Sequence, residues 1–142
     1  MKAVYYLDRH LVYCPVKKYF EQYAVSKKDT QKQKDKKIKL LKNIDEKIKY
    51  VIYNNGIPTP PISFPLDKMY HFFEIKHRKD QDVVIRIFYF RHNDKIVLLN
   101  VLEKPDNYDN EKENRKINKQ LEITKVFQNR FINNPQSYEE YN

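Results

Sequence analysis

The sequence predicts an α+β domain in which two N-terminal helices and one C-terminal helix cover one face of a small, twisted antiparallel sheet. Three observations predict this fold class. Apolar residues recur at helical spacing before Gly56, they form alternating aromatic and β-branched runs after Pro65, and a weak helical stripe returns beyond Pro105. A chain of 142 residues, 40% of them hydrophobic, is long enough for one core, so we expect a single domain over residues 1–142.

The N-terminal part predicts a strand followed by two helices. Residues 3–13 have apolar residues around a polar centre, which indicates one strand or two short strands joined by a turn. Pro15 suits the first turn of a helix that continues to about Ala24. A second, amphipathic helix is expected from a cap at Asp29 or Thr30 to the single glycine of the chain.

The C-terminal part predicts a loop, three strands and a helix. Four prolines make Ile57–Pro65 an extended crossing loop. Three sequential antiparallel strands are expected at residues 70–77, 83–90 and 96–102. The last two are joined by a hairpin turn centred on Asn93 and Asp94. A helix ends near Ile132, and residues 133–142 are expected to form a frayed tail.

The charge is strongly basic and is concentrated in one segment. There are 28 Lys and Arg against 19 Asp and Glu, a formal net charge of +9, which favours a polyanionic partner such as nucleic acid, an acidic protein or an anionic membrane surface. Residues 27–49 contain ten lysines and four acidic residues. This segment is either a solvated helix face or an RNA-binding surface formed by Lys32, Lys34, Lys36 and Lys37.

Several classes of function are disfavoured by composition. A single glycine leaves no glycine-rich phosphate loop, and Cys14 alone provides neither a disulfide nor a zinc knuckle. The four histidines lack metal-ligand spacing, so we expect no metal and no cofactor. The longest uncharged run, Tyr50–Leu66, contains four prolines and cannot span a bilayer, and no secretion signal is evident. We therefore expect a cytoplasmic protein without a membrane partner.

Cationic side chains cluster at the ends of the predicted strands. Arg86 interrupts an apolar run, so it needs either an ion-pair partner, Glu74 or Glu103, or an open functional face. Other cations, Lys76, His77, Arg78 and Lys104, lie at strand ends that a three-stranded meander brings together. Converging cations suit metal-independent RNA cleavage, which needs a base for the 2′-hydroxyl, charge stabilisation at the phosphate and an acid for the leaving oxygen.

Four segments carry a resemblance to a known family. The segments PVKKYF (15–20), FEIK (73–76), IRIFYF (85–90) and IVLLNVLEK (96–104) resemble the RelE/HigB-type toxins of bacterial toxin–antitoxin modules, in particular the phage-derived branch of the RelE/ParE superfamily. The resemblance implies a RelE-like fold, ribosome-dependent and metal-independent endonuclease cleavage of mRNA that inhibits translation, and neutralisation by a cognate antitoxin, a helix-turn-helix protein.

The resemblance also implies roles for individual residues. Arg86 matches the arginine that contacts the scissile phosphate, and Lys76 matches a basic position on the preceding strand. Lys104 matches the start of a basic motif, and Tyr108 corresponds to a tyrosine with a stacking or acid–base role. The sequence departs from the family at Pro105, where many members have a second basic residue. Two alternatives stay open, a ParE-like gyrase-poisoning toxin and a non-catalytic basic RNA-binding module.

Overall fold

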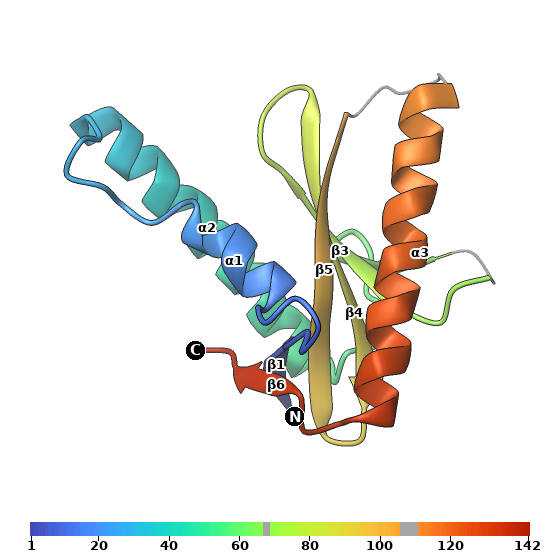
Figure 1. The fold of residues 1–142 in the computed structure, drawn as a ribbon. Coiled ribbons are helices and arrows are strands. Elements are labelled where there is room, and N and C mark those ends of the chain that lie inside the picture. The colour runs from blue at the N-terminus through green and yellow to red at the C-terminus, as the bar shows by residue number, and fades with distance from the viewer. Residues whose placement is uncertain (67–68, 106–110) are drawn as a thin grey trace.

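The computed structural model describes residues 1–66, 69–105 and 111–142. Along the chain its elements are β1 (Lys2–Tyr6), α1 (Pro15–Glu21), α2 (Gln31–Tyr53), β2 (Ser63–Pro65), β3 (Phe73–Arg78), β4 (Val83–His92), β5 (Lys95–Pro105), α3 (Glu111–Asn133) and β6 (Tyr138–Glu140) (Figure 1). The three predicted consecutive strands therefore correspond to β3, β4 and β5. None of the helices in the described ranges has the length and apolar content that a membrane crossing requires.

The strands form one mixed sheet of six strands in the order β2-β3-β4-β5-β1-β6. From β2 to β5 every neighbouring pair is antiparallel. The N-terminal strand β1 is inserted beside β5 and runs parallel to it, with Val4 opposite Val97. On its other side β1 pairs antiparallel with β6, with Tyr6 opposite Tyr138.

The predicted fold class is wrong, because the chain does not form the expected small antiparallel, RelE-like sheet with its helices on one face. The sheet is mixed and has six strands, α1 and α2 lie on one face, and α3 lies on the other (Figure 1). The reason is visible in β4, where Ile87 and Tyr89 pack toward α1 and α2 while Phe88 and Phe90 pack toward α3. A strand that is apolar at nearly every position is buried on both faces.

Helix α2 begins and ends at local signals in the sequence. Thr30 and Gln33 form a capping box, in which Thr30 Oγ1 accepts from Gln33 N at 3.2 Å and Gln33 Oε1 accepts from Thr30 N at 2.9 Å. Of the two expected caps, Thr30 is the one used. After the helix, Gly56 has a φ of 75°, and its carbonyl accepts from the Tyr89 hydroxyl at 3.2 Å. The first turns of α2 project beyond the sheet (Figure 1).

The expectation of a frayed tail at residues 133–142 is also wrong. Strand β6 is part of the sheet, and Glu139 forms an ion pair with Lys17 at 2.8 Å. The hydroxyl of Tyr141 donates to Asp45 on α2. The C-terminal segment therefore helps to hold α1 and α2 against the sheet.

Candidate functional site

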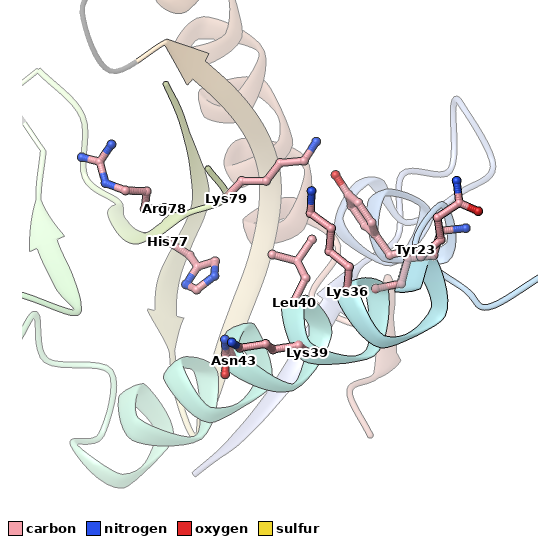
Figure 2. A pocket seen from close by; sticks show the side chains of 10 residues that line it. Tyr23, Lys36, Lys39, Leu40, Asn43, His77, Arg78 and Lys79 are labelled. Atoms are coloured by element: carbon pink, nitrogen blue, oxygen red, sulfur yellow. The ribbon is translucent and has the colours of Figure 1, made fainter. Parts of the chain in front are cut away.

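A cationic groove lies between α2 and the end of β3, with a volume of about 470 Å³ (Figure 2). We call it the α2–β3 groove. Its lining residues are Tyr23, Gln33, Lys36, Lys37, Lys39, Leu40, Asn43, His77, Arg78 and Lys79. Two of the predicted RNA-binding lysines and two of the predicted catalytic residues thus share one surface.

Both walls of the groove follow from regular backbone geometry. On α2, Lys36, Leu40 and Asn43 follow one another at intervals of four and three residues, so they lie on one face of the helix. On the sheet side, β3 ends at Arg78, and the backbone N–H of Lys79 donates to Val83 at 2.9 Å in the turn to β4. The ring of His77 points from β3 toward α2 (Figure 2).

Of the five cationic side chains that line the groove, two lysines are neutralised within the protein, two lysines are not, and Arg78 donates to the backbone carbonyl of Gln81 at 3.0 Å. Lys37 pairs with Asp29 at 2.8 Å, and Lys79 pairs with Glu103 at 3.1 Å. Lys36 and Lys39 form no ion pair with any residue in the described ranges. A concave surface with unneutralised ammonium groups attracts anions.

Glu103 holds one end of the groove in place. Its Oε1 atom accepts from the hydroxyls of Tyr19 and Tyr23 at 2.6 and 2.9 Å and from Lys79 Nζ at 3.1 Å. Burial by itself would raise the pKa of Glu103, but these three donors outweigh it and lower the pKa below its usual value. The carboxylate therefore stays ionised and fixes Tyr23 and Lys79 at the groove.

His77 is a partly buried titratable group in the groove. Burial, and to a smaller extent the charge of Lys47, lowers its pKa from the ordinary 6.5. Its Nδ1 atom is buried and has no hydrogen-bond partner among the described residues. At neutral pH the imidazole is therefore uncharged and has an unused polar atom.

A second pocket of about 620 Å³ adjoins the groove and shares Asn43 and His77 with it. The remaining lining residues are Glu46, Lys47, Tyr50 and Ile62. Lys47 Nζ donates to the backbone carbonyl of Lys76 at 3.0 Å, and burial lowers the pKa of Lys47. The two pockets together follow one face of α2 from Gln33 to Tyr50, roughly 26 Å at the usual helical rise.

Arg86 lies on the other face of the sheet. Its Nη1 donates to both oxygens of Glu74 at 3.0 and 3.1 Å, and Lys76 lies 3.5 Å from the same carboxylate. Lys76 is directly opposite Arg86 in the strand register, so both side chains are on the α3 face, whereas His77 is on the α2 face. Lys104, opposite Val84, is also on the α3 face.

The predicted cation cluster is therefore divided between the two faces of the sheet. Tyr108 lies outside the described residues. Lys32 and Lys34 are on α2 but do not line the groove. Lys39 and Lys79 line the groove but were not predicted as site residues. Two signals in the sequence could have identified them: Lys39 is three residues after Lys36 and so lies on the same helix face, and Lys79 lies shortly after a predicted strand.

Comparisons with protein-family models, with curated proteins and with solved structures found no significant match to this chain. Within the part of the chain that the structure describes, no three His, Cys, Asp or Glu side chains are grouped in a way that could hold a metal ion.

Proposed function

We propose that this protein binds RNA and that the α2–β3 groove holds the phosphate backbone. One observation carries the proposal: Lys36 and Lys39 line a concave surface without forming an ion pair in the described ranges, and Lys79, which pairs with Glu103, lines its opposite wall. Lysines that contact the phosphates of a strand displace the counterions bound there, and the release of these counterions favours binding. The net charge of +9 favours the approach of any polyanion.

Aromatic residues beside the cations favour a nucleic-acid strand over the other polyanions. Tyr50 lines the adjoining pocket, and Tyr23 lines the groove, where Lys79 Nζ lies 5.4 Å from the centre of its ring. A single strand presents alternating phosphates and exposed bases, and proteins bind it by combining cationic grooves with aromatic stacking surfaces. An acidic protein segment has no bases that would use such surfaces. RNA rather than DNA is the ligand implied by the sequence resemblance.

A second candidate function is RNA cleavage, and the position of His77 favours it. An uncharged imidazole in a cationic groove can accept the proton of a ribose 2′-hydroxyl. The 2′-oxygen then forms a bond to phosphorus as the bond to the 5′-oxygen breaks, and a lysine ammonium of the groove donates a proton to that oxygen. The products are a 2′,3′-cyclic phosphate and a 5′-hydroxyl. This activity is that of the toxin implied by the sequence resemblance, with mRNA on the ribosome as substrate and an antitoxin as partner.

RNA binding is tested with two double variants, each of which removes two lysine charges from the protein. In Lys36→Gln/Lys39→Gln, affinity for single-stranded RNA should fall, and the slope of log K against log salt should decrease by about 0.7 for each lost phosphate contact. The matched control is Lys28→Gln/Lys42→Gln, since both residues are exposed and neither lines the groove. Equal losses in the two double variants would contradict the groove and support a diffuse effect of net charge.

Cleavage is tested separately, by expressing the protein and sequencing cellular RNA ends. The toxin hypothesis predicts growth arrest with messages cut within ribosome-bound regions, and His77→Asn should abolish the cuts while the melting temperature confirms folding. Intact messages with damaged chromosomal DNA would instead favour the gyrase-poisoning alternative. Unaffected growth with retained RNA affinity would leave a non-catalytic RNA-binding module.

A further inference from the structure

The second pocket, formed by Asn43, Glu46, Lys47, Tyr50, Ile62 and His77, adjoins the groove that we propose holds the phosphates. Its volume of about 620 Å³ is within the range of small-ligand pockets. Lys47 Nζ, its one ammonium group, is bound to the backbone of β3. The pocket therefore offers neutral and acidic groups where the α2–β3 groove offers cations.

Three side chains of the pocket are unused within the protein. The amide of Asn43, the carboxylate of Glu46 and the hydroxyl of Tyr50 make no hydrogen bond with another side chain or backbone group in the described ranges. Tyr50 is 42% exposed and stacks on no other aromatic ring there. An aromatic face and two hydrogen-bonding groups are thus available at one place.

We propose that this pocket is a nucleobase subsite, in which one unstacked base of the bound strand lies against Tyr50 and is hydrogen-bonded by Glu46 and Asn43. The inference rests on the proposed RNA binding, because the phosphates next to this base would occupy the α2–β3 groove. Sequence-specific RNA recognition uses single-stranded bases that are splayed out, stacked on aromatic side chains and hydrogen-bonded at their edges. The shared residues Asn43 and His77 make the two pockets continuous.

The carboxylate selects the base. An ionised Glu accepts hydrogen bonds at two oxygens and donates none. Guanine has two adjacent donors, the ring N1–H and the exocyclic amino group, whereas uracil has a single ring donor flanked by carbonyl oxygens that a carboxylate repels. The subsite therefore prefers guanine over uracil, and it requires a single strand because these donors are paired in a duplex.

The experiment compares the affinities of fluorescently labelled RNA strands of about ten nucleotides, a length within the range that one binding domain covers. One strand contains only uridine, a second has a central guanosine, and a third is the second strand annealed to its complement. We expect the guanosine strand to bind most tightly. Tyr50→Ala should weaken binding of the guanosine strand about tenfold or more, since the stacking of one base on an aromatic side chain contributes a free energy that corresponds to such a factor.

The matched control for stacking is Tyr53→Ala, because Tyr53 is on the same helix, is 84% exposed and lines neither pocket. Glu46→Gln should remove the preference for guanosine, because affinity for the uridine strand rises when the repelling carboxylate is lost, whereas Glu21→Gln should leave the preference as it is in the wild type. Equal effects of Tyr50→Ala and Tyr53→Ala, or an unchanged preference in Glu46→Gln, would overturn the subsite.

The two proposals fail in different ways. If affinity depends on Lys36 and Lys39 but not on Tyr50 or Glu46, the nucleobase subsite is wrong and RNA binding by the α2–β3 groove stands. If the folded wild-type protein binds none of the three strands, both proposals are wrong. Melting temperatures of all variants show whether a loss of affinity reflects unfolding.

Discussion

Arg86 and Glu74 form a largely buried ion pair on the α3 face of the sheet, with Arg86 Nη1 3.0 Å from one carboxylate oxygen and 3.1 Å from the other. Their side chains are 14% and 7% exposed. Removing one partner of such a pair leaves the other charge without compensation in a poorly solvated place. The arginine is thus bound to the protein itself rather than directed toward an open surface.

The first prediction concerns the contribution of this pair to stability. Arg86→Met should lower the free energy of unfolding by about 3 kcal/mol, measured by urea denaturation, because Glu74 then keeps only the more distant Lys76. The double variant Glu74→Leu/Arg86→Met should lose far less than the sum of the two single variants. Additive losses would mean that the two residues contribute independently.

The second prediction separates the roles of Arg86 in folding and in activity. Arg86→Lys keeps the charge but loses the planar guanidinium, so it should lower the melting temperature by roughly 3 °C for each kcal/mol of lost stability. RNA binding by the folded fraction should remain as in the wild type. A variant with a normal melting temperature and a large loss of RNA cleavage would contradict this and restore Arg86 to the site that the sequence resemblance implies.

Local signals in the sequence predicted most of the elements correctly. The alternating runs located β3, β4 and β5, and the hairpin between β4 and β5 turns at Asn93, whose φ is 55°. The Thr30 cap and the position of Gly56 located α2. The ion pair between Arg86 and Glu74 was one of the two sequence interpretations. Each of these features depends on residues close together in the chain or on adjacent strands.

What the sequence could not predict depends on distant contacts. The parallel pairing of β1 with β5 joins Val4 to Val97, and no local pattern encodes such a partner. The groove likewise brings together Lys36 of α2 and His77 of β3, which are far apart in the sequence. The division of the cations between two faces was implicit in the alternation of Lys76 and His77, but only the register with β4 shows which face each one occupies.

The third prediction concerns the single glycine. Gly56 has a φ of 75°, and an added Cβ would lie 2.7 Å from Cγ of Arg91. Gly56→Ala should therefore lower the free energy of unfolding by about 1–2 kcal/mol, the usual cost of a left-handed conformation for a residue with a side chain. The neighbouring Asn55, with a φ of 57°, is the matched control, because Asn55→Gly should leave stability unchanged or increase it. An alanine variant as stable as the wild type would contradict the prediction.

The last prediction is that His77 makes the fold sensitive to acid. Burial, and secondarily Lys47, lowers the pKa of His77 in the folded protein below the 6.5 of the free side chain. As the pH falls through 6.5, the unfolded chain therefore binds a proton before the folded protein does, and stability decreases. Above that pH both states are uncharged and the full stability is present.

Urea denaturation from neutral pH to about pH 5, the range in which histidine titrates, measures the effect. His77→Gln should lose less stability over this range than the wild type, because glutamine does not take up a proton. His71→Gln is the matched control, since His71 is exposed and should leave the acid sensitivity as it is. Lys47→Met should reduce the sensitivity only in part, because burial is the larger cause of the pKa shift and persists in that variant. Equal acid sensitivity in the wild type and His77→Gln would assign the effect to other groups.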